Sequence, residues 1–213
     1  MAEHARLQVI DHPVVQHRLV TLRDEATTRA AFRLVVHELS TLIAYEAFGD
    51  LVTEEVSIRT PVSPEAPGRR VSETVLVVPV LRAGLGMVPA VQDLLPYSEV
   101  AYVGLRRDEE TLRSDVYLDR IPRDLRGRHV VVCDPMLATG GSLVQVCDLV
   151  AGRGAARVQV LCLLASVPGA ARFAAAHPGV TLTCAAVDPS LDERGYILPG
   201  LGDAGDRLFG PPA

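Results

Sequence analysis

One loop of this sequence combines a carboxylate with a run of small residues, a pairing suited to a phosphorylated sugar. Asp134 directly follows the apolar run His129–Cys133, and Thr139–Ser142 reads Thr-Gly-Gly-Ser. A carboxylate accepts hydrogen bonds from hydroxyl groups. The small residues leave backbone N–H groups at a helix start free to bind a phosphate. The alternative is an ordinary strand-to-helix turn with a glycine-rich helix start, and the loop alone does not separate the two.

A second loop repeats this arrangement with an arginine. Arg82 follows the apolar run Val75–Leu81, and Gly84 and Gly86 come before an apolar helical pattern. A guanidinium at such a turn can bind two phosphate oxygens at once, while the glycines let a ligand approach the backbone. A surface arginine beside a tight turn is the alternative. The repeated architecture favours a ligand site.

The basic residues restrict the possible chemistry. The chain has no lysine, so all 21 of its basic side chains are arginines. This excludes a Schiff-base lysine, and with it ordinary pyridoxal-phosphate chemistry. It also excludes a P-loop, which needs a lysine for the terminal phosphates. Any phosphate must therefore be bound by arginines and backbone amides.

The charged segment Arg106–Arg120 alternates only weakly between polar and apolar residues. It predicts a mobile hairpin or flap that could bring Arg106 or Arg107 to a covered site. A solvated charged loop explains the same residues equally well.

The C-terminal segment Asp192–Gly210 is rich in glycine yet contains several apolar residues. Gly200–Gly205 matches the dinucleotide pattern G-x-G-x-x-G, but Pro199 precedes it and too little chain follows for a crossover helix and a second strand. We therefore reject that match. A rigid loop that offers backbone N–H and C=O groups to a small planar ligand, such as a nucleobase, fits better. The alternative is a strap that closes the fold.

The elements that must position these loops alternate between strand and helix, which predicts an α/β fold with a mainly parallel sheet. Two N-terminal helices are expected first, then a strand and a proline-rich loop or small excursion over 61–70. Pro79 is awkward in a central strand and suggests an irregularity or the strand's end. The expected helices are 12–23, 27–48, 87–95, 143–150 and 170–176, and the expected strands are 53–60, 75–81, 99–105, 129–133, 157–165 and 180–187.

Length and composition favour one cytoplasmic domain. The chain has 213 residues, 48% of them hydrophobic, and a net charge of −5, which argues against a general nucleic-acid binder. No apolar run reaches membrane-spanning length, and the N-terminus lacks the apolar region of a signal peptide. Cys133, Cys147, Cys162 and Cys184 lie in apolar segments without a Cys-x-x-Cys pair, which is typical of buried cysteines in a reducing compartment.

Four segments together carry a resemblance to a known family. Val78–Met87, Val103–Leu112, Asp134–Ser142 and Gly195–Arg207 are similar to the signature segments of uracil phosphoribosyltransferase, in the same order and over almost the whole chain. The resemblance implies a single type I phosphoribosyltransferase domain over 1–213. This fold has a mainly parallel central sheet flanked by helices, with N-terminal helices, a flap hairpin at about 106–121 and a C-terminal hood at about 188–210.

The resemblance also implies a reaction. Uracil and 5-phospho-α-D-ribose 1-diphosphate (PRPP) would give UMP and diphosphate with Mg²⁺, in pyrimidine salvage. The metal would be held mainly by PRPP, without a direct protein ligand that can be named. Uracil would be recognised by Ile197, Gly202, Asp203 and Ala204. PRPP would be bound by Arg82, Arg107, Asp134, Pro135, Met136, Leu137, Ala138, Thr139, Gly140, Gly141, Ser142 and Asp203.

Among these residues, Asp134, Asp203 and Arg107 would act in catalysis, and Asp203 could reach Mg²⁺ through water. Arg106 departs from the family, which usually has tyrosine before the flap arginine, so either Arg106 or Arg107 could make the main phosphate contact. Pro135 stands where many relatives outside the uracil branch carry a second acid. The resemblance further implies a homodimer or higher oligomer and a possible GTP activator.

Two rival functions remain. One is a pyrimidine-sensing RNA-binding regulator of the same fold, against which the acidic net charge speaks. The other is a phosphoribosyltransferase for another base, against which the glycine-rich segment Gly200–Asp206 speaks. No partner nucleic acid or membrane is expected.

Overall fold

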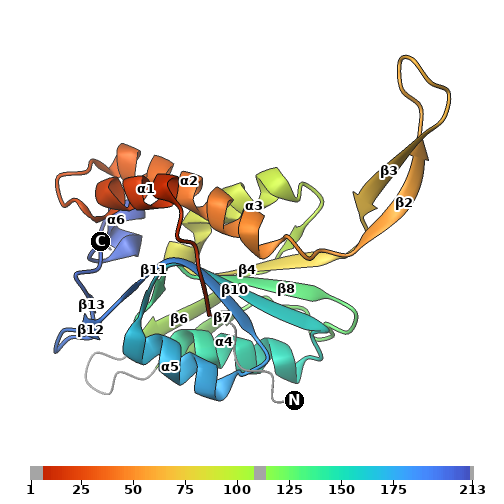
Figure 1. The fold of residues 1–213 in the computed structure, drawn as a ribbon. Helices are drawn as coiled ribbons and strands as arrows, with labels where there is room; N and C mark the ends of the chain where they lie inside the picture. The colour runs from red at the N-terminus through yellow and green to blue at the C-terminus, as the bar shows by residue number, and fades with distance from the viewer. Residues whose placement is uncertain (1–6, 108–113, 212–213) are drawn as a thin grey trace.

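The computed structural model describes residues 7–107 and 114–211, in which a central β-sheet lies between two layers of helices (Figure 1). The sheet has nine strands in the order β1-β11-β10-β8-β4-β6-β7, with β5 beside β4 and β9 beside β10. Every pair is parallel except β6 with β7. The strands are β1 (Leu7–Val9), β4 (Val75–Leu81), β5 (Glu99–Val100), β6 (Val103–Arg107), β7 (Ser114–Asp119), β8 (His129–Cys133), β9 (Met136–Leu137), β10 (Arg157–Ser166) and β11 (Thr181–Asp188). The predicted fold class is confirmed.

The central strands form where the sequence has uninterrupted apolar runs. All five residues of β8 are buried, as are the first six of β4 and the last eight of β10. Continuous burial is expected for parallel strands covered on both faces, and valine and leucine suit such positions. The three runs at 75–81, 129–133 and 157–165 are therefore strands as predicted.

Pro79 lies inside the central strand β4 because the neighbouring strand is interrupted beside it. On one side, β4 pairs with β8 as far as Pro79 and Cys133. On the other side, it pairs with β5 at Val77 and with β6 only from Val80. No ladder bond is needed from Pro79, which has no N–H to give. The expected strand at 99–105 is accordingly two short strands.

Helices cover both faces of the sheet (Figure 1). One layer holds α1 (Pro13–Arg23), α2 (Arg29–Ala47), α3 (Val88–Leu94) and α6 (Ala204–Phe209), and the other holds α4 (Gly141–Gly152) and α5 (Val167–Ala176). Each layer packs on its own apolar cluster, one centred on Phe32 and Leu39 and one on Val146 and Phe173. Thr28 caps α2, since its side chain accepts a hydrogen bond from the Ala31 N–H. No helix in these described ranges is long and apolar enough to span a membrane.

Several elements of the tail were not predicted. The segment expected to be a rigid loop forms the hairpin β12 (Ser190–Leu191) and β13 (Ile197–Leu198) and then helix α6.

The four cysteines are buried and unpaired, as predicted. Burial raises the pKa of the Cys133 thiol to about 12, so it stays protonated and unreactive at neutral pH.

A two-stranded arm forms where a loop or small excursion was predicted at 61–70. β2 (Thr53–Ile58) pairs antiparallel with β3 (Ala66–Val71), and the hairpin projects away from the sheet and helices (Figure 1). Pro67 and Gly68 argued against a strand in the sequence. A two-stranded ribbon has no central strand, so one missing N–H is tolerated there.

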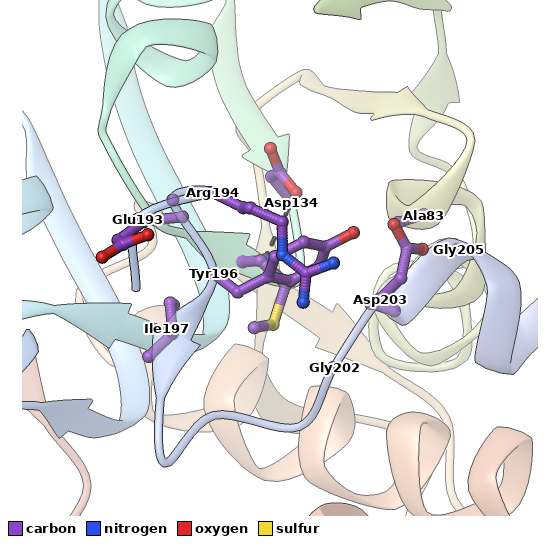
Figure 2. A pocket seen from close by; sticks show the side chains of 13 residues that line it. Ala83, Asp134, Glu193, Arg194, Tyr196, Ile197, Gly202, Asp203 and Gly205 are labelled. Carbon is purple, nitrogen blue, oxygen red and sulfur yellow. Dashed lines mark hydrogen bonds between the residues drawn. The ribbon is translucent and has the colours of Figure 1, made fainter. Parts of the chain in front are cut away.

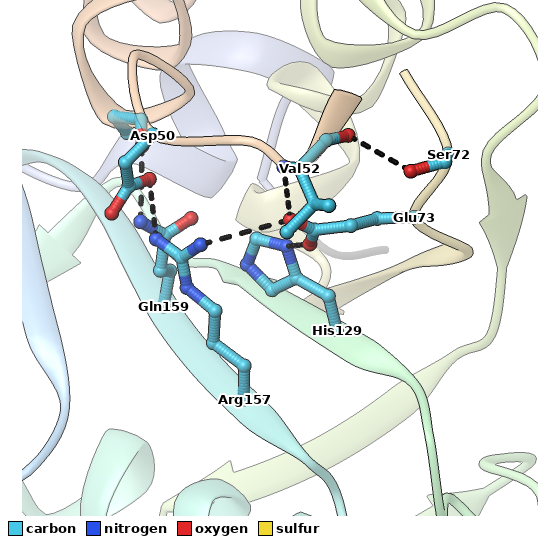
Figure 3. Close-up of polar contacts among 8 residues, drawn as sticks. Asp50, Val52, Ser72, Glu73, His129, Arg157 and Gln159 are labelled. Atoms are coloured by element: carbon cyan, nitrogen blue, oxygen red, sulfur yellow. Dashed lines mark hydrogen bonds and ion pairs between the residues drawn. The ribbon is translucent and has the colours of Figure 1, made fainter. Parts of the chain in front are cut away.

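A polar network ties the base of the arm to the amino ends of the central strands (Figure 3). Glu73, just after β3, accepts a hydrogen bond from the Val52 backbone N–H at 2.5 Å and bonds His129 Nδ1 at 2.8 Å. Arg157 pairs with Asp50 at 2.5 Å and approaches Glu73 at 4.0 Å. The network therefore fixes both ends of the arm to β8 and β10.

His129 should make folding stability sensitive to acid. Burial and the Arg157 charge lower the pKa of His129 below its usual 6.5, against the opposing effect of Glu73. As the pH falls, the unfolded chain therefore protonates this histidine at a higher pH than the folded chain does. The free energy of unfolding decreases as a result below about pH 6.5. We expect urea unfolding to show a steeper loss between about pH 7.5 and about pH 5.5 in the wild type than in His129→Gln.

The exposed His17 supplies the control for this measurement, because His17→Gln removes a histidine of the same chemical type from the surface of α1. Its slope should match that of the wild type. Equal slopes in the wild type and His129→Gln would contradict the assignment to His129.

Candidate functional site

A cavity of about 890 Å³ opens at the carboxyl edge of the sheet (Figure 2). Parallel α/β sheets bind ligands at this edge, where the strands end in loops. The cavity is lined by Ala83 after β4, by Asp134, Met136 and Ala138 after β8, and by the hood segments 193–197 and 202–205. The three loops singled out in the sequence therefore meet in one place.

A smaller cavity of about 140 Å³ adjoins the first and shares Asp134, Met136 and Ala138 with it. Its wall is made by Asp134 and residues 136–143, which include the start of α4. The two cavities form a path from the α4 N-terminus, past Asp134, to the hood. Such a path can hold an anion at one end and a flat group at the other.

Asp134 lies at the junction of the two cavities. It directly follows β8 and accepts a hydrogen bond from the Met136 N–H at 3.3 Å. One side of the carboxyl reaches the cavity, but the surrounding apolar strand ends remove it from water. This desolvation raises the pKa of Asp134 to about 7, against the weaker opposing effect of the Met136 bond. A carboxylate this poorly solvated gains strongly from a ligand that donates hydroxyl groups.

The small-residue loop adopts the geometry needed to present N–H groups. Gly140 has a φ of +80°, which favours glycine, and it is the N-cap of the twelve-residue helix α4. The loop packs closely against Gly169 in α5. A Cβ on Gly169 would lie only 2.1 Å from the Ala138 carbonyl oxygen. The Ser166 hydroxyl donates to that same oxygen at 2.6 Å. The N-terminus of α4 is thereby held open toward the smaller cavity, where it can attract an anion.

The turn after β4 lies against the end of β8. A Cβ on Gly84 would lie 2.3 Å from the Cys133 carbonyl oxygen, so only glycine fits this contact. Arg82 lies beside the cavity rather than in its wall. Its Nη2 donates to Asp206 at 3.0 Å, and its Nη1 donates to the Gly210 carbonyl at 3.4 Å. The guanidinium is thus held between the turn and the hood.

Asp203 begins helix α6 at the edge of the cavity. Its Oδ1 accepts a hydrogen bond from the Asp206 backbone N–H at 2.8 Å, which makes it the N-cap. The residue is exposed on the cavity side, as are Gly202 and Tyr196. The side chains of Ile197 and Ala204 are apolar and buried, so only the backbone groups of these residues can form hydrogen bonds with a ligand.

The first helix anchors the hood. Arg23 at the end of α1 forms a two-pronged ion pair with Asp188, both bonds at 2.7 Å, and donates to the Gly200 carbonyl at 2.9 Å. Asp188 also accepts from the Gly200 N–H at 2.9 Å. Arg207 in α6 stacks on Phe32 at 4.2 Å. Arg207 also donates to the carbonyls of Leu22, Leu201 and Asp24.

Arg23→Met should therefore destabilise the hood strongly. The change leaves Asp188, whose side chain is only 6% exposed, as a buried charge without its partner. Breaking such a pair typically costs about 3–5 kcal/mol of folding free energy. Arg18→Met on the same helix is the control, since the Arg18–Glu38 pair is 37% and 30% exposed and should be worth at most about 1 kcal/mol. Chemical unfolding measures both, and equal losses would contradict this reading of Arg23.

Most of the predicted site residues lie on one of the two cavities. Asp134, Met136 and Ala138 line both, and Ile197 and Gly202–Ala204 line the larger. Leu137 and Thr139–Ser142 line the smaller. Pro135 is buried beneath the loop, where its carbonyl accepts bonds from the N–H groups of Leu163 and Leu164. The side chain of Arg107 and residues 108–113 of the predicted flap lie outside the described residues.

Sequence reasoning missed the three polar side chains that the β12–β13 hairpin adds to the cavity wall. Glu193, Arg194 and Tyr196 lie on the β12–β13 hairpin and line the larger cavity (Figure 2). The Arg194 guanidinium lies over the Tyr196 ring at 5.6 Å and approaches Asp192 at 3.8 Å. Among the described residues that line this cavity, Arg194 carries the single positive charge. In the sequence, Tyr196 next to Gly195 in the glycine-rich segment was the signal that could have pointed to this part of the wall.

Comparisons with known proteins agree on one family. The family model described as uracil phosphoribosyltransferase matches residues 9–211. Proteins named uracil phosphoribosyltransferase from Kineococcus radiotolerans and Streptomyces avermitilis are each 51% identical over 208 residues. The matches cover 96% of this chain and 99% and 98% of those proteins, respectively.

Solved structures extend the likeness to the fold. The AQ2163 protein from Aquifex aeolicus superposes with a TM-score of 0.89 at 34% identity, covering 96% of this chain and 98% of that chain. A hypoxanthine phosphoribosyltransferase from Staphylococcus aureus superposes with a TM-score of 0.52 at 10% identity, which shows a shared fold alone.

Proposed function

Because the chain belongs to the uracil phosphoribosyltransferase family, we propose that it converts uracil and PRPP to UMP and diphosphate. The observation that carries this proposal is the continuous path from the α4 N-terminus, past Asp134, to the hood. Its order suits a 5′-phosphate, a ribose and a base in turn. A purine-specific relative would need a different hood, and the matched relatives support uracil.

The phosphoribosyl end has a role for each predicted residue. We assign the 5′-phosphate to the N–H groups of residues 138–142 and the ribose hydroxyls to Asp134, with Met136 and Leu137 shaping the wall. Pro135 supports the loop from below. We assign binding of the diphosphate to Arg82 and to Arg107 of the flap, with Arg106 as the alternative to Arg107. Asp203 faces this ligand from the hood side.

The base end would read uracil through main-chain groups. Uracil alternates hydrogen-bond donors and acceptors along one edge, as does a backbone segment. Ile197, Gly202 and Ala204 supply such groups, and Asp203 joins them at the start of α6. A cytosine amino group or a thymine methyl group would leave polar groups unpaired or clash with the wall, which is how such sites reject close analogues.

The transfer breaks the bond from C1′ of the ribose to the diphosphate oxygen and forms a bond from C1′ to N1 of uracil. Uracil loses its N1 proton, and diphosphate leaves with the electron pair of the broken bond and takes up one proton in exchange. Positive charge grows on the ribose ring meanwhile, so catalysis depends on positioning and charge stabilisation rather than on a protein nucleophile. Asp134 beside the ribose and arginines beside the diphosphate suit these two charges.

Mg²⁺ is the expected cofactor. Among residues 7–107 and 114–211, no group of three or more His, Cys, Asp or Glu side chains has metal-site geometry. We expect the metal to be held mainly by PRPP oxygens and water, the common mode for Mg²⁺ with phosphates. Asp203 could join it through water. When bound, the ion would neutralise the departing diphosphate.

The direct test is UMP formation. Purified protein with uracil, PRPP and Mg²⁺ should yield UMP by chromatography, at a rate well above that with cytosine, thymine or hypoxanthine. Faster turnover of another base, or no nucleotide from any base, would overturn the proposal. RNA binding measured across salt concentrations tests the regulator alternative, and we expect no salt-dependent binding.

The broader biology follows from the family as expectations. We propose one domain over 1–213, with a flap at about 106–121 and a hood at about 188–210, acting in the cytoplasm in pyrimidine salvage. A homodimer or higher oligomer fits the apolar side chains exposed on α1, α2 and the arm, Val20, Tyr45 and Val62 among them. Sedimentation tests this, and a rate titration tests GTP as an allosteric activator.

A further inference from the structure

Asp206 connects the two sides of the cavity. It is the third residue of α6, and its side-chain Oδ1 accepts a hydrogen bond from Arg82 Nη2 at 3.0 Å. Its backbone N–H donates to Asp203 Oδ1 at 2.8 Å. One residue therefore contacts both the arginine at the end of β4 and the aspartate at the start of α6, which come from segments more than 120 positions apart.

These contacts leave the functional ends of both partners available. A guanidinium has five N–H donors in a rigid fork, and the bonds to Asp206 and Gly210 use two of them. The remaining donors are oriented by those two bonds. The capping bond likewise uses one oxygen of Asp203, which lines the cavity. Asp206 thus sets the direction of both groups without lining the cavity itself.

We propose that Asp206 is a positioning residue that orients Arg82 for the diphosphate of PRPP and links it to the base-binding hood. This inference rests on the proposed function, since it concerns the same site. In the proposed function Arg82 binds the diphosphate, and Asp203 faces both PRPP and the base. Their shared contact with Asp206 links the position of one group to that of the other.

A purely structural role for Asp206 is disfavoured by how α6 is held. Arg207 donates to the carbonyls of Leu22 and Asp24 in the α1 region, and Arg33 donates to the Leu208 carbonyl. The Arg82–Asp206 side chains are 45% and 41% exposed, and such pairs add little to stability. Neutralising Asp206 should therefore leave the fold intact and alter the direction of Arg82.

The test is a double-mutant cycle on PRPP binding with Asp206→Asn, Arg82→Gln and the double variant. Asparagine keeps the size of the side chain and the backbone N–H but lacks the charge. We expect Asp206→Asn to weaken Mg²⁺–PRPP binding about tenfold by titration calorimetry, as for loss of one charge-assisted bond. In the Arg82→Gln background the same change should add less than about twofold. The KM for PRPP should rise more than kcat falls.

The controls separate positioning from folding. Asp124→Asn breaks a similar exposed pair with Arg126, remote from the cavity, and should bind PRPP as the wild type does. Asp206→Glu keeps the charge and should recover part of the lost affinity. Thermal midpoints of all variants should lie close to that of the wild type.

Three results would overturn the inference: additive losses in the cycle, a fall in thermal midpoint that accounts for the lost affinity, or tighter binding by Asp206→Asn. Failure of the proposed function gives a different pattern. In that case the wild type forms no UMP, while the non-additive binding cycle persists.

Discussion

Asp134→Asn should lower kcat/KM for PRPP by about 10²–10³-fold, the range found when one preorganised charge-stabilising group is removed from an active site. The carboxylate lies at the junction of the two cavities, where the ribose would lie. Asparagine fits the same space and can still accept the Met136 N–H, but it cannot balance positive charge on the ribose ring. Steady-state kinetics with varied PRPP measure the loss.

The pH dependence gives this prediction a second readout. Since the pKa of Asp134 is raised to about 7, the free enzyme should gain activity as the pH rises through about 7. The activity of Asp134→Asn should lack that rise and should depend on pH only through the ionisation of PRPP itself. Stability should change with the opposite sign. The folded-state pKa exceeds the unfolded value of about 3.8, so the charged carboxylate opposes folding most strongly above pH 7.

Asp134→Asn should therefore be at least as stable as the wild type at about pH 8, so that lost activity cannot be ascribed to unfolding. Asp148→Asn is the matched control, because Asp148 lies on the outer face of α4 with its side chain 69% exposed. Its kinetics should resemble those of the wild type. An unchanged pH profile in Asp134→Asn would remove Asp134 from the reaction.

Gly84→Ala should disrupt both stability and catalysis. The added Cβ would lie 2.3 Å from the Cys133 carbonyl oxygen and 3.1 Å from the Pro79 Cα, both rigid backbone atoms in buried strands. Such overpacking typically costs about 1–3 kcal/mol of folding free energy. Because Cys133 directly precedes Asp134, the turn with Arg82 and the loop with Asp134 would be pushed apart. A displacement near 1 Å can reduce turnover about 10²-fold.

Gly152→Ala supplies the control, since a Cβ there meets no atom within 4 Å at the last residue of α4. It should change the free energy of unfolding by less than about 1 kcal/mol, in the stabilising direction, and leave kinetics unchanged. Unfolding in urea and kcat measured on the two variants test the pair. Wild-type behaviour in Gly84→Ala would show that the two loops need not approach so closely.

The sequence predicted the parts of the site that depend on local patterns. Val75–Leu81 and His129–Cys133 are apolar runs, followed by Arg82 and Asp134 respectively and then by small residues, and both runs form strands as expected. The sequence also predicted that the two loops lie close together, because neighbouring parallel strands end at the same edge of a sheet. These elements need no information from distant residues beyond burial.

The parts that escaped prediction depend on distant contacts. The strands β12 and β13 have two residues each, too few for an alternating pattern, and α6 forms on a glycine-rich segment with Asp203 as its cap. The pairing of Arg82 with Asp206 spans 124 positions, which no local pattern encodes. Arg194 and Tyr196 reach the cavity only because the hairpin turns them there.

The anchoring of the hood on α1 also bears on how the protein is made. Arg207 binds the carbonyl of Leu22 across 185 positions of chain, near the largest separation possible in this molecule. During synthesis the sheet and the loop at 138–142 can assemble while the last residues are still inside the ribosome. The hood side of the cavity therefore closes last, so under the proposed function the phosphate-binding loop would form before the base-binding segment.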